Sequence, residues 1–191
     1  MSTLSPSQQE QARSSIDWLA SLDENERTAT IESLSPSERI ALSELLFDWT
    51  LHAREKQLPP PGDWFIWMVR AGRGFGKTRT GAEYVRSRID AGEWRTVNIA
   101  GPTKNDVLDV MLMGTPEAPG LLGLWPEHQR PKHDITKMRV RCHNGAIIRY
   151  RSADEPERFR GPQADGGWCD EIDSWKPKGM SAQEADRKSV V

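Results

Sequence analysis

The sequence predicts an α/β domain with a mainly parallel sheet, preceded by an α-helical segment. Beyond residue 60, short runs of β-branched and aromatic residues alternate with stretches of helical periodicity, as in sheets whose strands are joined by helices. Before residue 60, apolar residues recur at helical spacing. We therefore expect a helical segment over residues 1–58, an α/β core over residues 59–175 and a polar, disordered tail over residues 176–191.

The composition allows one ordinary domain with an appendage, since 36% of the 191 residues are apolar. No apolar run approaches the roughly 18 residues of a membrane span, and the first residues lack a basic region followed by an apolar one. We therefore expect a protein of the cytoplasm that does not enter a membrane. Cys142 and Cys169 lack metal-ligand spacing, which favours two buried, reduced thiols.

Charge is distributed unevenly along the chain. Residues 1–60 carry five Lys or Arg against ten Asp or Glu, whereas the remainder carries 21 against 18. The first segment is therefore acidic and the remainder mildly basic, a balance that neither indicates nor excludes nucleic acid as a partner. The eight tryptophans are more typical of core or interface anchors than of ligand platforms.

The helical segment contains one clear helix start. Ser35 and Pro36 are followed by Glu38, which gives an N-cap, a proline in the first turn and the acidic partner of a capping box. From Ile40 to Leu51 the apolar residues keep one helical face until the prolines of residues 59–61 end it. We interpret this as a packing or adaptor helix with a solvated acidic outer face.

The core begins with residues 64–69, which are aromatic and β-branched enough to predict a short buried strand. A glycine-rich turn follows, and then a helix with Ala82, Val85 and Ile89 on one face. A second strand is expected over residues 96–100, a helix over residues 106–113 and a loop rich in glycine and proline over residues 114–131.

The glycine-rich turn predicts a nucleotide phosphate site. Strand, glycine loop and a helix opening with Gly-Lys-Thr form the context of the Walker A motif. Glycines let backbone N–H groups approach an anion at the positive end of a helix, Lys77 places a charge on the β and γ phosphates, and the Thr78 hydroxyl holds Mg²⁺. The first position is Ala71 where the motif has glycine, a mild change; the alternative is a flexible basic turn that binds nothing. The predicted phosphate-binding residues are Gly72, Arg73, Gly74, Phe75, Gly76, Lys77 and Thr78.

The middle of the chain predicts a β-hairpin. Two extended runs, residues 138–143 and 146–151, flank an Asn-Gly turn at residues 144 and 145. The runs carry Arg139, Arg141, Arg149 and Arg151. This basic stretch fits either contact with a phosphate backbone or the solvated face of an edge hairpin, and the sequence does not decide between them.

A second half of the site is predicted near the end of the core. Residues 164–171 read as a short strand ending in Asp170 and Glu171, where Asp170 would hold Mg²⁺ and Glu171 would orient the attacking water. Two glycines in this strand weaken the prediction, and the alternative is an acidic loop. Arg160 is a candidate stabiliser of phosphoryl-transfer charge, unless Arg158 and Arg160 only pair with nearby glutamates.

Taken together, the motifs resemble the large terminase subunit of tailed phages and gene transfer agents between about Trp49 and Trp175. The resemblance is carried by residues 61–64, 73–78 with 81–83, 101–103, 152–156, 160–163 and 168–171. It implies a P-loop NTPase of the additional-strand, catalytic-glutamate type. Such an enzyme uses ATP and Mg²⁺ to drive double-stranded DNA into a capsid in the host cytoplasm. Its implied partners are the portal protein and the small terminase subunit, and a ring is expected only on the portal.

The resemblance also implies roles for single residues. Lys77 and Thr78 match the phosphate and Mg²⁺ positions, Asp170 the second Mg²⁺ position and Glu171 the catalytic glutamate. Arg73 matches the loop arginine, and Arg160 matches an arginine thought to act across a ring. The family's threonine-rich coupling motif and nuclease do not follow Glu171, so we expect a truncated or frameshifted gene. A helicase-like P-loop ATPase and a non-catalytic fragment that binds nucleotide or a partner are the alternatives.

Overall fold

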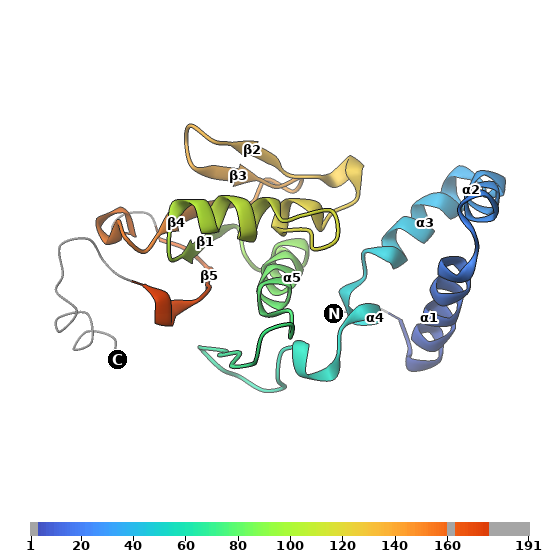
Figure 1. The fold of residues 1–191 in the computed structure, drawn as a ribbon, viewed down its shortest axis with the longest axis horizontal. Coiled ribbons are helices and arrows are strands. Elements are labelled where there is room, and N and C mark those ends of the chain that lie inside the picture. Colours follow the sequence, from blue (N-terminus) through green and yellow to red (C-terminus); the bar gives the residue numbers. More distant parts are fainter. Residues whose placement is uncertain (1–3, 160–162, 176–191) are drawn as a thin grey trace. The chain divides into compact units, whose positions relative to one another are not determined.

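The computed structural model describes residues 4–159 and 163–175. The chain divides into two compact units, and the boundary between them in the sequence falls between Asp63 and Trp64. No described helix is long and apolar enough to cross a membrane. Each unit is described on its own below (Figure 1).

The first unit is helical, as its periodicity predicts. Its elements are α1 (Pro6–Ser21), α2 (Glu24–Ser33), α3 (Pro36–Leu46), α4 (Trp49–His52) and the 3₁₀ turn η1 (Glu55–Gln57). Capping boxes begin α1, α2 and α3, at Ser5, Asp23 and Ser35. The periodicity argument missed α2, whose residues are mostly polar.

The prediction of one continuous helical face from Ile40 to Leu51 is wrong. The helix ends after Leu46, and Asp48 starts a new short helix by accepting a hydrogen bond from the Thr50 N–H at 2.9 Å. An aspartate side chain that bonds the backbone two residues on competes with helix continuation, which explains the break.

The second unit contains one mixed, five-stranded sheet in the order β2-β3-β4-β1-β5. The strands are β1 (Thr96–Gly101), β2 (Lys132–Asp134), β3 (Arg139–Arg141), β4 (Ile147–Ser152) and β5 (Gly166–Cys169). β1 pairs in parallel with both β4 and β5, whereas β3 pairs antiparallel with β4 and with β2. The α/β class is confirmed, and the parallel part of the sheet is limited to three strands.

Two helices cover one face of this sheet. They are α5 (Lys77–Asp90) and η2 (Asp106–Met113), which is wound as a π-helix (Figure 1). Ala82, Val85 and Ile89 are buried, as predicted, in one cluster with Ile99 and Ile148 of the strands. The loop of residues 114–131 contains two 3₁₀ turns, η3 (Leu121–Gly123) and η4 (Glu127–Gln129). It enters this core through Leu121 of η3, Leu124 and a fully buried Trp125.

The predicted hairpin is confirmed, but it does not form the edge of the sheet. Arg141 pairs with Ile147, and the Cys142 N–H bonds the Ala146 carbonyl at 2.9 Å across the turn. The short strand β2, which the sequence analysis did not predict, covers the outer side of β3.

Residues 64–69 do not form the predicted buried strand. Phe65, Ile66 and Met68 are 98%, 73% and 69% exposed. Trp64 and Trp67 both contact the Tyr84 ring, with centroids 5.7 and 5.4 Å away. Residues three apart point to opposite faces of a strand, so contact of both tryptophans with one ring is incompatible with regular strand geometry.

The glycines of β5 have a steric explanation. A Cβ at Gly166 would lie 2.1 Å from the Trp94 ring, and one at Gly167 would lie 2.9 Å from the Asn98 carbonyl oxygen. The strand forms despite its composition because these close contacts require residues without side chains. On the same strand Cys169 is exposed, which corrects the prediction of two buried thiols; burial raises the pKa of Cys142 to about 12.

Candidate functional site

The glycine-rich loop leads directly into α5. Gly74 and Gly76 both have a φ of +81°, in the left-handed region that glycine adopts without steric cost. Gly76 is the N-cap of α5 and offers no side chain to its first turn. The first N–H groups of a helix have no partner within the helix and form the positive end of its dipole, which attracts anions.

Lys77 folds over this loop. Its ammonium nitrogen Nζ donates to the carbonyl oxygens of Ala71 at 3.0 Å and Gly72 at 3.3 Å. Ala71 contributes its backbone here, so the methyl group that replaces glycine does not interfere with the contact. The positive charge of Lys77 therefore lies at the loop itself.

A hydrogen bond joins the loop helix to the end of β5. The Thr78 hydroxyl donates to Oδ2 of Asp170 at 2.9 Å, across 92 positions of sequence. The Asp170 N–H continues the sheet by bonding the Ala100 carbonyl at 2.9 Å, and its carbonyl accepts from the Trp175 indole at 3.0 Å. The backbone of Asp170 is therefore fixed at both its N–H and its carbonyl group, which fixes the position of the carboxylate.

Glu171 adopts an unusual backbone conformation. Its φ of +49° and ψ of +47° are left-handed, which costs a residue with a Cβ about 1–2 kcal/mol. Its N–H donates to Oδ1 of Asp170 at 3.1 Å, and the residue is exposed. Such strain persists only where the surrounding structure imposes it, and it is concentrated at functional sites.

These groups lie at one edge of the sheet. β1, β4 and β5 run parallel and end at Gly101, Ser152 and Cys169, so Asp170 follows a carboxyl end and faces the first turn of α5 through Thr78. The carboxyl edge of parallel strands is the usual place for ligands in α/β proteins.

The remaining predicted residues are placed differently. Arg73 and Phe75 belong to the loop, with Arg73 exposed and Phe75 half-buried. Arg160 lies outside the described residues. Arg158 forms an ion pair with Glu155 at 2.8 Å, and both side chains are largely exposed, so this pair matches the alternative of a weak surface interaction.

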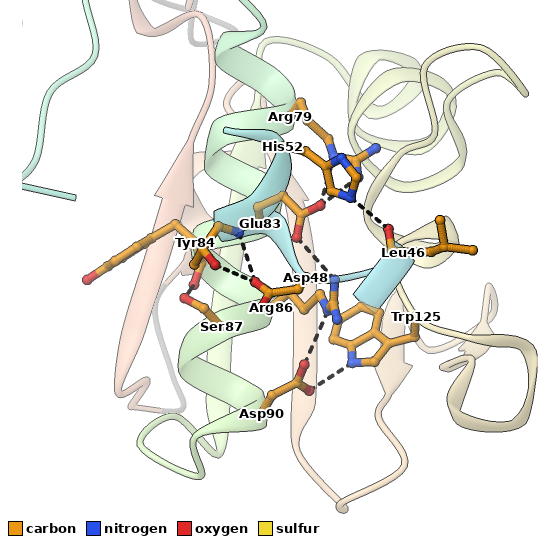
Figure 2. A network of polar contacts seen from close by, with 11 residues as sticks. Leu46, Asp48, His52, Arg79, Glu83, Tyr84, Arg86, Ser87, Asp90 and Trp125 are labelled. Carbon is orange, nitrogen blue, oxygen red and sulfur yellow. Dashed lines mark hydrogen bonds and ion pairs between the residues drawn. The ribbon is translucent and has the colours of Figure 1, made fainter. Parts of the chain in front are cut away.

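A buried carboxylate on α5 was missed by the sequence analysis. Glu83 is 2% exposed and bonds Arg79 at 2.6 Å and Arg86 at 3.3 Å. Arg86 also bonds Asp90, which accepts from the Trp125 indole at 2.8 Å (Figure 2). Burial raises the pKa of Glu83, and the two arginines act in the opposite direction. The (i, i+3) and (i, i+4) spacing of these charges was the feature of the sequence that could have predicted these ion pairs.

The site combines an ammonium, a helix N-terminus, a hydroxyl and a carboxylate. Among the described residues, no group of three or more His, Cys, Asp or Glu side chains could hold a metal ion. A cation here would rely on Thr78 and Asp170 together with oxygens from a ligand, as Mg²⁺ does beside phosphates. The arrangement therefore suits an anion that brings a divalent cation.

The chain matches a known protein family over most of its second unit. The family described as terminase large subunit, T4likevirus-type, N-terminal, matches residues 68–183, which is more than half of the chain. The chain belongs to this family. The terminase match covers the glycine-rich loop, α5, the whole sheet and Asp170, and it confirms the resemblance found in the sequence. No curated protein and no solved structure matches the chain. Membership in the terminase family indicates a role in phage DNA packaging.

Proposed function

We propose that this chain is the ATPase motor part of a DNA-packaging terminase and that it hydrolyses ATP with Mg²⁺ to move double-stranded DNA into a procapsid. The observation that carries the proposal is the 2.9 Å hydrogen bond between Thr78 and Asp170. It joins the first turn of a helix that follows a glycine-rich loop to a carboxylate at the carboxyl end of a strand. A P-loop NTPase brings the same two residue types to its nucleotide.

The phosphates of ATP fit the loop and the start of α5. Gly74 and Gly76 have the positive φ that lets successive N–H groups face an anion. In the proposed complex the Lys77 ammonium leaves the carbonyls of Ala71 and Gly72 and contacts the β and γ phosphates. Gly72, Arg73 and Phe75 complete the backbone cradle.

Thr78 and Asp170 are the proposed protein ligands of Mg²⁺. The fit is favourable because both offer oxygen atoms, which lie 2.9 Å apart, and Mg²⁺ prefers one or two carboxylates with phosphate and water oxygens. When bound, the ion neutralises negative charge on the phosphates. Asp170 is oriented for this role by the Glu171 N–H and the Ala100 carbonyl.

Glu171 is the proposed catalytic glutamate. Its exposed carboxylate adjoins Asp170 and would accept a proton from, and orient, the attacking water. Arg73 in the loop and Arg160 are proposed to stabilise the charge that develops during phosphoryl transfer. The portal protein and the small terminase subunit are the proposed partners, with a ring formed on the portal in the host cytoplasm.

A test is Mg²⁺-dependent ATP hydrolysis by the full chain, with binding of a fluorescent ATP analogue measured on the same samples. We expect Lys77→Ala to weaken binding and hydrolysis together. Glu171→Gln should retain binding and lose hydrolysis by roughly 10²-fold or more. Matched controls are Lys56→Ala in the helical unit and Glu127→Gln in η4, both exposed in the wild type.

The outcomes separate an active ATPase from a fragment that binds nucleotide without turnover. If the wild type binds the analogue and its hydrolysis equals that of both site variants, the chain binds nucleotide without turnover and the motor proposal is wrong. If Lys77→Ala binds as well as Lys56→Ala, the loop is not the phosphate site.

A further inference from the structure

The two faces of the sheet have opposite chemistry. Strand register places Arg139 of β3 directly opposite Arg149 of β4, which in turn neighbours Asn98 of β1. Side chains alternate along a strand, so Arg149 and Arg151 lie on the same face. The cations of this face are Lys132, Arg139, Arg141, Arg149 and Arg151, and we call it the arginine face.

The described helices of the second unit leave the arginine face open. α5 and η2 both pack on the opposite face, against residues such as Ile99 and Ile148. On the arginine face Lys132 and Arg141 are exposed, as are Gly167 and Cys169 of β5. At the centre of the face Ala100 and Nη1 of Arg149 are buried, so its exposed cations lie on the outer strands β2 and β3.

The positive charge of the arginine face is poorly compensated within the described residues. Asp134 is the one carboxylate that the register places among these cations, and it lies 3.6 Å from Arg139. Nη1 of Arg149 is buried and has no hydrogen-bond partner. A buried donor without an acceptor costs free energy, so the Arg149 guanidinium adds an unsatisfied positive group to the centre of the face.

Further cations gather where β4 ends. The Arg151 guanidinium donates to the Tyr150 carbonyl at 2.8 Å and to the Arg158 carbonyl at 3.3 Å. Burial lowers the pKa of Arg151, and the nearby charges of Arg158 and Arg149 lower it further. Arg151 and Arg158 line a hollow together with Thr136, Lys137 and Met138. Arg158 is paired with Glu155 at 2.8 Å, so Arg151 and Lys137 carry the positive charge of the face into this hollow.

We propose that the arginine face binds the phosphate backbone of double-stranded DNA. Side chains on neighbouring strands are about 5 Å apart and those two residues apart on a strand about 7 Å apart, which gives a closely spaced array of cations. Planar guanidinium groups bind phosphate oxygens in pairs. Large apolar side chains, which form the centre of a protein interface, are scarce on this face, where Ile147 is half-buried. These features favour a polyanion over an acidic protein.

The arginine face extends to the edge of the sheet at which the proposed nucleotide site lies. Arg151 is the penultimate residue of β4, at the same edge of the sheet where β5 leads into Asp170. The inference rests on the proposed packaging function for its biological meaning, because a packaging motor must contact the DNA that it moves. Binding of DNA to the face can nevertheless be measured without ATP.

The test is fluorescence anisotropy of the full chain with a labelled DNA duplex, over salt concentrations from about 50 to about 200 mM. The first variant is Lys132→Gln with Arg141→Gln, since both side chains are exposed and their loss should not disturb folding. The second is Arg149→Gln with Arg151→Gln. The matched control is Arg88→Gln with Arg95→Gln, which removes the same charge from α5 and from the residue before β1.

We expect both face variants to weaken DNA binding several-fold and to reduce the slope of log affinity against log salt by about 2, because each lost phosphate contact removes about 0.9. The control should bind like the wild type. Equal binding by wild type and the exposed-face variant, or no binding by wild type, would overturn the proposal. It would also fail if a polyglutamate competitor bound the wild type more tightly than the duplex, since an acidic protein would then be the partner.

Binding of the ATP analogue to the same variants separates this inference from the proposed function. Face variants that lose DNA and keep the analogue support the arginine face. A wild type that binds DNA through the face and does not bind the analogue would reject the nucleotide site alone.

Discussion

The two sides of the glycine-rich loop contrast in sequence and in structure. Residues 64–69 are all apolar and form no regular element, whereas α5 is mostly polar and packs as a helix on the sheet. Downstream, Val85 and Ile89 of α5 are fully buried against the sheet. Upstream, Phe65, Ile66 and Met68 are among the most exposed apolar side chains of the described chain. The comparison teaches that apolar sequence forms an element only where another element offers a surface to pack against.

The partners available to each side explain the difference. α5 has the sheet on one side, and its Gly81 lies against the Trp168 ring of β5. Of the residues upstream, Trp64 and Trp67 pack on Tyr84. Among the described strands β5 pairs with β1 alone, so residues 64–69 add no strand to its other edge.

The largest expected contrast is between two isoleucines on either side of the loop. Ile89→Ala should lower the free energy of unfolding by about 2–5 kcal/mol, because it removes buried methylenes and leaves a cavity. Ile66→Ala should change it by less than about 0.5 kcal/mol, because Ile66 is 73% exposed. Urea unfolding followed by tryptophan fluorescence measures both. A cost for Ile66→Ala close to that of Ile89→Ala would show that residues 64–69 are buried in solution.

A smaller contrast is expected between two glycines. A Cβ at Gly81 would lie 2.2 Å from the Trp168 ring, whereas one at Gly72 would meet no atom within 4 Å. Gly81→Ala should therefore cost about 1–3 kcal/mol through overpacking, and Gly72→Ala should be nearly neutral. The same unfolding experiment tests the pair. Equal midpoints for Gly81→Ala and wild type would mean that α5 and β5 are not in close contact.

Much of the site could be predicted because its chemistry is local. The loop glycines, Lys77 and the start of α5 follow from a few adjacent residues, and the Asn-Gly turn similarly fixes the hairpin. The contacts that explain the glycines at 81, 166 and 167 join distant segments. Composition alone therefore argued wrongly against the prediction of β5. The exposed state of residues 64–69 could not be predicted either, since the same residues suit a buried strand when a neighbouring strand is available.

The smallest expected effect concerns the pH dependence of stability. Burial raises the pKa of Glu83 on α5, so the folded state holds this proton more tightly than the unfolded state does. The stability that protonated Glu83 contributes to the folded state is present below its ordinary pKa of 4.5 and is lost as pH rises through its folded-state pKa. The pKa of Asp165 shifts in the opposite direction. Hydrogen bonds from the Thr96 and Arg95 N–H groups, both 2.8 Å, lower its pKa, so its contribution is present above 3.8 and lost as pH falls through the folded pKa.

Unfolding free energies from about pH 3 to about pH 8 separate the two carboxyl groups. Glu83→Gln should flatten the decline of stability above its ordinary pKa, and Asp165→Asn should flatten the decline toward acid. If Glu83→Gln instead lost stability at neutral pH and kept the wild-type slope, the ion pairs with Arg79 and Arg86 would outweigh burial. The charge network of Figure 2 would then stabilise α5, and the difference between the two sides of the loop would rest on ion pairing as well as on apolar packing.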